Sequence, residues 1–341
     1  MINIILAIND KFIKQAATTI MSIYKNSNKN SLMKINILHS DITQQNQNIM
    51  KDMVKNMENI SEFNFVDMSK IVTNNFFDKY MCKEKFCSYV SSETYYRLFI
   101  PNLFPQYDKV LYLDSDIIVC EDLTELYNTD IDNLYAGVVS VYKYFFKNVL
   151  SFNDDKIISE EYLARKLNIL NKTYFNAGVL LLNLNEMRKG NIQEKSFKFL
   201  FENYPLLYQD QDILNSLFNN KIKFLDRRYN VYYRHFLDNK PTTVLHFAGP
   251  QKPWNSYKLN KGFELYWKYF KLTPFYNETE EKLYLDLKKV PPKEKKNIKI
   301  ILGKQRYRLK IFHNTFSINP SFYRKSKKKI LSLITKRKSR P

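Results

Sequence analysis

Short apolar runs alternate with amphipathic stretches along the first 70 residues. Residues 2–8 form a run typical of a buried strand, and apolar residues then recur on one helical face from 12 to 24. The same patterns predict a strand over 34–39, a helix over 43–57 and a strand over 62–67. Because strands and helices alternate, we predict an α/β fold with one doubly wound, mostly parallel sheet. In such sheets ligands bind beyond the carboxyl ends of the strands.

Two aspartates interrupt the apolar stretch over 109–120. Asp114, Ser115 and Asp116 stand between one apolar run and the next. Carboxylates beside a buried strand are costly unless a cation or hydrogen bonds compensate them. An Asp-x-Asp at a strand end is therefore a candidate site for a hard metal ion, and the capping of a turn is the simpler alternative.

A capped helix is predicted from Ser91 to Ile100, closed by Pro101. Arg97 lies in it among aromatic and aliphatic neighbours. An arginine in such surroundings usually has an anionic partner. Arg97 is therefore either a ligand contact or a plain surface charge.

A polar entry precedes the apolar strand that begins near residue 175. Asn176, Ala177 and Gly178 form this entry, and a glycine, one of only six in the chain, suits a close approach of backbone or ligand. A plain core strand would explain residues 179–182 but not this start.

Residues 209–212 place two glutamines and two acids at the opening of a helix. Acids in a first turn complement the helix dipole, which is the simpler interpretation for Asp210 or Asp212. That interpretation does not explain the alternating glutamines, Gln211 among them, which suggest a ligand rich in hydroxyl groups.

A further apolar strand ends at His246. Gly249 and Lys252 follow at short spacing, which is the composition of a phosphate-binding loop. A lone histidine is more often structural than a ligand. Two carboxylates and one imidazole, if they meet, suit Mn²⁺ better than Mg²⁺.

The positive charge of the chain is concentrated at its C-terminal end. The net charge is +20, and residues 281–341 carry +17 of it, with 20 Lys or Arg and three acids. Among these bases, Leu302, Leu309, Phe312 and Phe316 recur near helical spacing. We predict a basic helical tail over 281–341 that binds an anionic membrane surface, and a solvated, disordered tail is the alternative.

Other features narrow the class of protein. The sequence has no Gly-x-Gly-x-x-Gly and no Walker loop, which argues against a dinucleotide-binding domain and a P-loop ATPase. It has neither a signal-peptide pattern nor a membrane-spanning apolar run, and its three cysteines suit a reducing cytoplasm. Two alternatives remain. One is a haloacid-dehalogenase-like phosphatase; the other is a non-enzymatic nucleic-acid-binding protein, which the near-neutral charge of residues 1–280 argues against.

Six segments, taken in order, resemble glycosyltransferase family 8. Within that family they are most similar to the bacterial galactosyl- and glucosyltransferases that build the outer core of lipopolysaccharide. The segments are 7–10 (Ala-Ile-Asn-Asp), 94–97 (Thr-Tyr-Tyr-Arg), 112–116 (Tyr-Leu-Asp-Ser-Asp), 175–178 (Phe-Asn-Ala-Gly), 209–212 (Gln-Asp-Gln-Asp) and 246–254 (His-Phe-Ala-Gly-Pro-Gln-Lys-Pro-Trp).

The resemblance implies a GT-A catalytic domain over residues 1–280, a UDP-hexose donor (galactose or glucose) and Mn²⁺, with Mg²⁺ as the alternative ion. It further implies transfer with retention of anomeric configuration. The acceptor would be a saccharide of lipopolysaccharide, lipooligosaccharide or another surface glycan, lipid-linked at the inner face of the cytoplasmic membrane. Nucleic acid is not an expected partner.

The resemblance also implies roles for individual residues. The metal would be held by Asp114, Asp116 and His246. The donor, from base to sugar, would be bound by Ala7, Ile8, Asn9, Arg97, Asp114, Ser115, Asn176, Ala177, Gly249 and Lys252. Asp210 and Gln211 would be catalytic, either of them standing where a nucleophile attacks. Front-face transfer, with the diphosphate as base, is the alternative.

Two positions depart from the family pattern. Close relatives have an aspartate that contacts uracil, where this chain has Asn9, and Lys11 replaces the next polar contact. An amide still pairs with uracil, so the base preference is weakened rather than lost. Near Val141, relatives often carry an aspartate that touches the sugars, and its absence leaves the donor sugar and the acceptor open.

Overall fold

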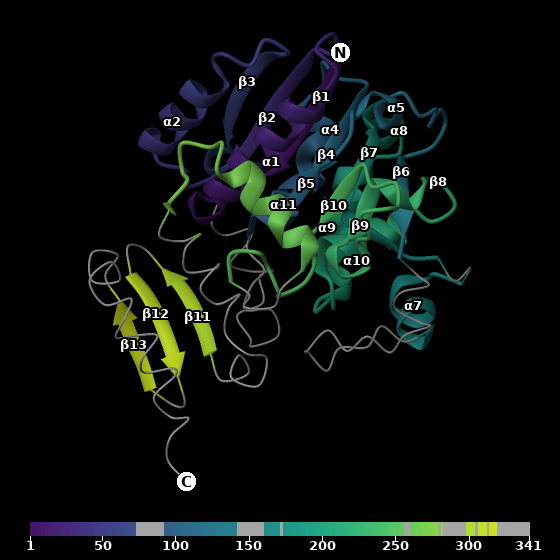
Figure 1. The fold of residues 1–341 in the computed structure, drawn as a ribbon. Helices are drawn as coiled ribbons and strands as arrows, with labels where there is room; N and C mark the ends of the chain where they lie inside the picture. The colour runs from purple at the N-terminus through teal and green to yellow at the C-terminus, as the bar shows by residue number, and fades with distance from the viewer. Residues whose placement is uncertain are drawn as a thin grey trace.

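A seven-stranded sheet runs through the molecule in the order β3-β2-β1-β4-β7-β6-β8 (Figure 1). The computed structural model describes residues 1–72, 92–141, 160–170, 173–255, 260–278 and 281, together with three strands between 298 and 318. The strands of the large sheet are β1 (Ile2–Ala7), β2 (Met33–His39), β3 (Ile60–Asp67), β4 (Lys109–Leu113), β6 (Ala136–Ser140), β7 (Phe175–Asn183) and β8 (Ile222–Phe224).

Most neighbouring strands of this sheet are parallel. Only β7 runs antiparallel to its neighbours, β4 and β6, among the described strands of the sheet. The prediction of an α/β fold with a mostly parallel sheet is therefore confirmed. A smaller sheet, ordered β5-β10-β9, begins just beyond the carboxyl end of β4 and comprises β5 (Ile117–Val119), β9 (Val231–Tyr232) and β10 (Val244–His246).

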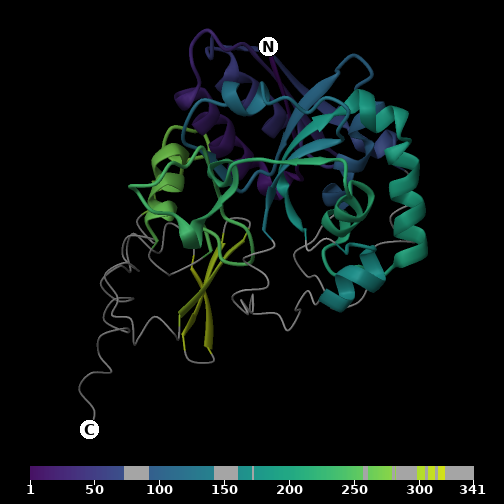
Figure 2. The same cartoon turned by 90° about the vertical axis from the view of Figure 1, so that its right-hand side faces the viewer.

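Helices cover both faces of the large sheet; in Figure 2 the purple helices α1 and α2 and the teal helices α8 and α9 lie on opposite sides of it. The α-helices are α1 (Ile13–Asn26), α2 (Gln44–Val54), α4 (Ile100–Leu103), α5 (Thr124–Tyr127), α7 (Glu160–Leu167), α8 (Leu184–Lys189), α9 (Ile192–Asn203), α10 (Gln209–Leu217) and α11 (Lys261–Phe270). The 3-10 helices are η1 (Asp10–Phe12), η2 (Met68–Lys70), η3 (Ser92–Phe99), η4 (Arg227–Asn230) and η5 (Tyr233–His235).

The period of two along each strand divides the core between these two helical layers. On β4, Leu111 and Leu113 belong to the apolar cluster beneath α1, whereas Val110 and Tyr112 belong to the cluster beneath η3, α8 and α10. All four side chains are fully buried. A strand that is apolar on both faces is thus explained by its central position, and polar residues appear only where it ends.

The helix predicted to end at Pro101 is wrong in its boundaries. Ser91 lies outside the described residues, η3 covers Ser92–Phe99, and α4 continues from Ile100. Pro101 therefore stands inside the first turn of α4, where a missing backbone N–H costs nothing because that group would have no helical partner. The other strands and helices predicted within residues 1–280 are present, with ends shifted by a few residues.

The helical prediction for the tail is also wrong where the structure describes the tail. Residues 298–318 form three antiparallel strands, β11 (Ile298–Gly303), β12 (Arg306–Ile311) and β13 (Asn314–Ile318), drawn in yellow in Figure 1. The stretch from Arg306 to Ile311 alternates basic and apolar residues with the period of a strand, and this pattern outweighs the looser helical spacing. Within the described residues, no helix is long and apolar enough to span a membrane.

Candidate active site

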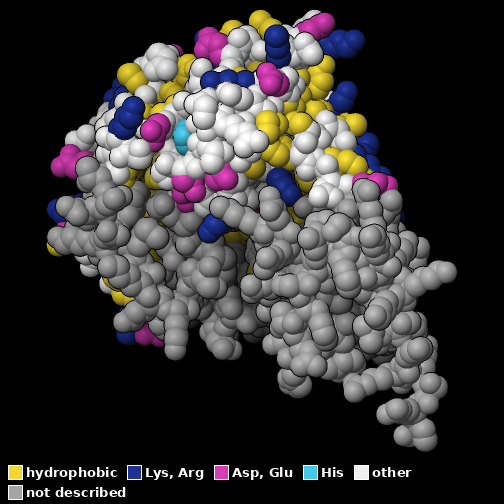
Figure 3. All heavy atoms as spheres, turned by 90° about the vertical axis from the view of Figure 1, so that its left-hand side faces the viewer, with side chains coloured by type: hydrophobic (Ala, Val, Ile, Leu, Met, Phe, Trp, Pro, Cys, Tyr) yellow, Lys and Arg dark blue, Asp and Glu magenta, His cyan; other side chains and the backbone are white. Residues whose placement is uncertain are grey.

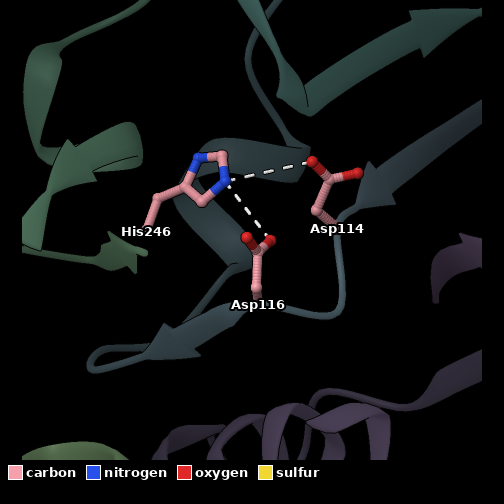
Figure 4. Close-up of side chains that lie close together, drawn as sticks. All are labelled: Asp114, Asp116 and His246. Atoms are coloured by element: carbon pink, nitrogen blue, oxygen red, sulfur yellow. Dashed lines mark ion pairs between the residues drawn. The ribbon is translucent and has the colours of Figure 1, made fainter. Parts of the chain in front are cut away.

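Three side chains of types that can bind a metal meet where the large sheet ends. Asp114 directly follows β4, Asp116 precedes β5, and His246 is the last residue of β10. Strands β5 and β10 pair antiparallel with His246 opposite Ile117, and the N–H of Phe247 donates to the carbonyl of Asp116 (2.9 Å). Backbone pairing therefore brings the imidazole beside the carboxylates, although more than 100 residues separate them in the chain (Figure 4).

The geometry of this cluster suits one cation. The His246 Nε2 lies 3.3 Å from Asp116 Oδ1 and 3.9 Å from Asp114 Oδ2, and one ligand atom from each residue lies within 4.8 Å of the others. Ligands at right angles around a small divalent ion stand roughly 3 Å apart, given metal–ligand distances of about 2.1 Å. Two carboxylates and an imidazole form a donor set for a divalent transition metal. The residues present thus fit such an ion.

A chain of hydrogen bonds fixes the position of the proton on His246, because it determines what faces Nδ1, the ring nitrogen away from the aspartates. The N–H of Gly178 donates to Asn176 Oδ1 (3.0 Å), so the amide of Asn230 must donate to that same oxygen (2.9 Å). The carbonyl oxygen of Asn230 then faces His246 Nδ1 at 2.9 Å and accepts from it. The proton of the neutral ring is held on Nδ1, and the lone pair of Nε2 is directed at the aspartates.

Gly178 is required by this close packing. A side chain at this position would place its Cβ 2.4 Å from His246 Cε1 and 2.7 Å from Asp114 Oδ2. Neither contact is sterically tolerable, because both neighbours belong to the cluster itself. A backbone or a ligand was expected to come close at the Asn-Ala-Gly entry of β7; the groups that approach Gly178 are instead the side chains of the cluster.

Arg97 is buried and connects the metal cluster to the start of α10. It donates to Asp114 Oδ1 (3.0 Å) and to the carbonyl of Ala177 (2.6 Å), and it pairs with Asp210 Oδ2 (3.0 Å). Its guanidinium also lies over the ring of Tyr112. Burial disfavours the charged form, but the two carboxylates outweigh it and hold the pKa of Arg97 above its ordinary value. Arg97 is not a surface charge.

Asp210 and Asp116 are shifted in opposite directions. Burial raises the pKa of Asp210 to about 7, despite the neighbouring charge of Arg97, and Asp114 adds to the effect. Burial also acts on Asp116, but the ammonium of Lys252 and the imidazole of His246 hold its pKa well below the usual range. The two aspartates therefore differ in how readily they hold a proton, although they carry the same side chain.

The amide of Gln211 is held in one orientation. Its Oε1 accepts from Asn176 Nδ2 (3.0 Å) and from the N–H of Ala177 (3.1 Å), and its Nε2 donates to the hydroxyl of Tyr174 (3.0 Å). That hydroxyl in turn donates to Asp212 (2.5 Å), which is fully enclosed. Gln211, Asn176 and Ala177 are thus brought together as predicted.

Lys252 lies on the metal side of the site. Its ammonium contacts Asp116 Oδ2 and donates to the carbonyl of Phe247 (2.7 Å). The loop that carries it contains Gly249 with a φ of 90°, a conformation that favours glycine. Ser115 is buried in the turn between β4 and β5, and its carbonyl accepts from the hydroxyl of Thr19 on α1 (2.9 Å).

The residues predicted for the base lie at the carboxyl end of β1. Ala7 ends the strand, and the N–H of the buried Ile8 donates to the carbonyl of Leu38 (3.0 Å). The amide nitrogen of Asn9 donates to Glu93 Oε2 (3.3 Å), across from the start of η3. The second polar position predicted to differ, Lys11, is exposed in η1 and points to no partner in the described contacts of this site.

Four residues that contact the predicted ones were assigned no role from the sequence: Glu93, Tyr112, Tyr174 and Asn230. Tyr112 stands two residues before Asp114, so the period of the strand places both on one face, and this signal was readable. Its hydroxyl donates to Asp114 Oδ1 (3.1 Å). Asn230 ends η4 and Tyr174 lies just before β7, and nothing around them in the sequence indicates a role.

Comparison with known proteins identifies a family for most of the chain. The model of the family described as "Glycosyl transferase family 8" matches residues 3–258. A protein of Haemophilus influenzae named "Putative glycosyltransferase" is 30% identical over 265 residues, which cover 74% of this chain and 73% of that protein. The lipopolysaccharide 1,2-glucosyltransferase of Escherichia coli is 30% identical over 201 residues, covering 54% of this chain and 56% of the relative.

Solved structures have the same fold as this chain. The bifunctional glycosyltransferase WbbM has a TM-score of 0.67 at 26% identity, and the match covers 83% of this chain and 51% of that chain. The galactosyltransferase LgtC, solved with donor and acceptor sugar analogues, has a TM-score of 0.67 at 23% identity, covering 82% of this chain and 99% of that one. The fold is thus that of GT-A glycosyltransferases.

Proposed function

We propose that this chain, which belongs to glycosyl transferase family 8 and is a hexosyltransferase, moves galactose or glucose from a UDP-sugar to a saccharide of a bacterial surface glycan. The transfer would retain the anomeric configuration and take place with Mn²⁺ bound. One observation carries this proposal. Two carboxylates and an imidazole with a fixed tautomer converge at the carboxyl end of β4, where α/β sheets bind their ligands.

Asp114, Asp116 and His246 would hold the ion, and Mg²⁺ is the alternative to Mn²⁺. When bound, a divalent ion neutralises negative charge that develops on a leaving diphosphate. Lys252 would contribute to the same task, because its ammonium already lies beside Asp116 on a loop shaped by Gly249. The turn of Ser115 and the ends of β1 at Ala7, Ile8 and Asn9 would line the rest of the nucleotide site.

The transferred sugar would lie between Arg97, Asn176, Ala177, Asp210 and Gln211. Both lone pairs of the Gln211 amide oxygen are engaged by donors, which supports a positioning role for Gln211 rather than attack on the sugar. Asp210 is the better candidate for stabilising a cationic sugar, since it is buried and faces Arg97.

Two routes to retention remain. In the first, Asp210 attacks the anomeric carbon and the diphosphate leaves; the acceptor oxygen then displaces the carboxylate, and the acceptor's proton passes to the diphosphate. In the second, the acceptor attacks from the face that the diphosphate leaves, and the diphosphate takes the hydroxyl proton. The second route assigns to Asp210 only the stabilisation of positive charge. Mass spectrometry of a glycosylated Asp210 peptide after stalled turnover would establish the first.

The acceptor is proposed to be a lipid-linked saccharide of lipopolysaccharide type. Two relatives support this, the lipopolysaccharide 1,2-glucosyltransferase of Escherichia coli and the 1,3-galactosyltransferase of Salmonella typhimurium, which is 28% identical over 180 residues. Both share about half of their length with this chain, 56% and 50%. The basic tail over 281–341 would hold the catalytic domain, residues 1–280, at the inner face of the cytoplasmic membrane. Each base near an anionic surface contributes about 1 kcal/mol.

Deletion of the residues after Glu281 tests the tail. We expect transfer to a soluble acceptor sugar to stay within about twofold, because the described contacts of the site come from residues 9–252. Binding to anionic liposomes should be lost, and added salt should release the full-length protein from them. Cosedimentation of the truncated protein with the same liposomes would contradict a membrane role for the tail.

The two alternative functions are less well supported. The match of the family 8 model to residues 3–258 argues against a phosphatase. Nucleic-acid binding needs a basic surface on the main domain. On the face drawn in Figure 3, basic and acidic side chains are intermixed across the part of the surface that the structure describes.

A panel of UDP-sugars, assayed for Mn²⁺-dependent release of UDP, tests the proposed function. UDP-galactose or UDP-glucose should be hydrolysed slowly without acceptor and faster with an acceptor saccharide. Asp116→Ala should abolish both activities, and Asp52→Ala, a change at an exposed position of α2, should abolish neither. Equal turnover with and without a divalent ion would contradict the metal assignment.

A further inference from the structure

A buried carboxylate lies against Asn9 at the nucleotide end of the site. Glu93, in η3, is 7% exposed, and its Oε2 accepts from the amide nitrogen of Asn9 at 3.3 Å. Its Oε1 accepts weakly from the hydroxyl of Ser40, which follows β2 (3.5 Å). These contacts join the ends of β1 and β2 to η3, three elements that are distant in the chain.

This carboxylate determines which way the amide of Asn9 points. An ionised carboxylate can only accept hydrogen bonds, so the NH₂ group of Asn9 must face Glu93 and its carbonyl oxygen must face away. An aspartate at position 9 would present an acceptor in either rotamer. An asparagine presents one only while its amide is prevented from flipping, and Glu93 supplies that restraint.

The carbonyl oxygen of Asn9 has no donor of its own. Asn9 Oδ1 is enclosed, and no hydrogen bond reaches it from the described part of the chain. A buried acceptor without a donor is costly, and such groups in native proteins usually have a partner supplied from elsewhere. The missing partner must therefore be a hydrogen-bond donor, and it must reach the carboxyl end of β1.

We propose that Glu93 is a positioning residue that makes the enzyme select uracil, by holding the Asn9 carbonyl where it accepts the N3–H of the base. The proposal rests on the function given above, in which this end of the site binds the nucleotide of the donor. Uracil carries a donor at ring position 3. Cytosine carries a lone pair there, which would face the lone pairs of Asn9, so the fixed amide attracts one pyrimidine and repels the other.

Competition binding of UDP and CDP tests the proposal, with Mn²⁺ at a fixed concentration and the full-length protein. The wild-type chain should bind UDP about 100-fold more tightly than CDP, because a site built around one hydrogen bond strongly rejects a ligand that lacks it. In Glu93→Gln, the introduced amide can donate or accept, so the Asn9 amide is free to flip. The preference should fall to less than about tenfold, chiefly through tighter binding of CDP.

A compensating double variant separates orientation from simple loss of structure. In Asn9→Asp/Glu93→Gln, the introduced glutamine donates to the introduced aspartate, whose second oxygen again accepts from N3–H. The preference for UDP should return to within about threefold of wild type. Glu62→Gln, a matched change on the exposed face of β3, should leave the preference unaltered.

The outcomes are distinguishable from failure of the proposed function. A wild-type chain that binds neither UDP nor CDP would overturn the assignment of a uridine nucleotide donor altogether. A clear wild-type preference for UDP that persists in Glu93→Gln would overturn the role of Glu93 and leave the donor assignment intact. Loss of the preference in Glu93→Gln without recovery in the double variant would also contradict the orientation mechanism.

Discussion

The site contains two Asp-x-Asp pairs, Asp114/Asp116 and Asp210/Asp212, which share spacing and composition but little else. The first pair stands where β4 ends, and its side chains are 26% and 14% exposed. The second pair opens α10, and its residues are 6% and 0% exposed. The first faces an imidazole and an ammonium, whereas Asp212 is surrounded by the hydroxyls of Tyr162 and Tyr174 and a backbone N–H.

Spacing alone therefore does not determine the role of a carboxylate. A strand end directs acids i and i+2 toward one edge of the sheet, where both can reach a cation. The first turn of a helix directs them to different faces. Asp210 therefore meets Arg97, while Asp212 turns inward and stabilises the fold around Gln211. Of the two pairs, only the first lies beside a third side chain with which it could hold a metal.

The largest effect is expected from removing a member of the first pair. Asp116→Ala should reduce transfer about a thousandfold, because it removes both a metal ligand and the partner of Lys252. His246→Ala should have a similar effect. The midpoint of thermal unfolding should change little, since Asp116 lies at the rim of the sheet. Transfer would be measured at micromolar Mn²⁺, and full activity of Asp116→Ala there would contradict its role as a ligand.

The second comparison is between Asp210 and Gln211. If Asp210 is a covalent nucleophile, Asp210→Asn should lose nearly all turnover, and Gln211→Ala should keep most of it. If transfer is front-face, both variants should fall by comparable factors of about 10 to 100, because each residue then only positions or stabilises. Single-turnover rates at saturating donor measure the chemical step. Unimpaired turnover in both variants would remove them from the catalytic site.

Within the second pair, Asp212 should act on the fold more than on the reaction. Asp212→Asn places an NH₂ group against donors, so we expect the free energy of unfolding in urea to fall by about 2–3 kcal/mol. Turnover should fall about tenfold through the loosened Gln211. Tyr174→Phe is the matched control, since it removes the link to Gln211 and leaves Asp212 with Tyr162. Stability of Asp212→Asn equal to wild type would show that the network is not what holds α10.

The position of the first pair at a strand end could be predicted from the sequence, whereas the meeting of Asp210 with Arg97 could not, for a physical reason. Asp114 and His246 stand at the ends of apolar strands and Asp116 directly before one, and such boundaries are visible as changes in hydrophobic pattern. The convergence of Asp210 with Arg97 depends on how η3 packs against α10, a tertiary contact with no local signal. For the same reason Asn230, which fixes the tautomer of His246, was not predicted.

The fold shows the same limit. The alternation of strands and helices predicted the α/β class and the position of the ligand edge, because both follow from local periodicity. The antiparallel direction of β7 was not predicted, since direction depends on how the chain returns between β6 and β7 rather than on the strand itself. In the tail, a helix was predicted where β12 lies, because the two-residue alternation of basic and apolar side chains was not recognised as a strand pattern.

The smallest expected effect is a dependence of stability and transfer rate on pH. It distinguishes the two pairs without a change in metal binding. Asp210 has a pKa of about 7 in the native state, raised by burial from an ordinary value near 3.8. Between about pH 4 and 7 the native protein therefore holds a proton that the unfolded chain has lost, so the contribution of Asp210 to stability decreases as pH rises through this window and is constant above it.

The transfer rate should show the opposite trend if the ionised form is active, rising about tenfold from pH 6 to pH 8. Asp210→Asn should flatten both profiles. Asp116, whose pKa is held low, should add no transition in this range. A rate profile that stays unchanged in Asp210→Asn would assign the ionisation to another group, and the contrast between the two pairs would then rest on geometry alone.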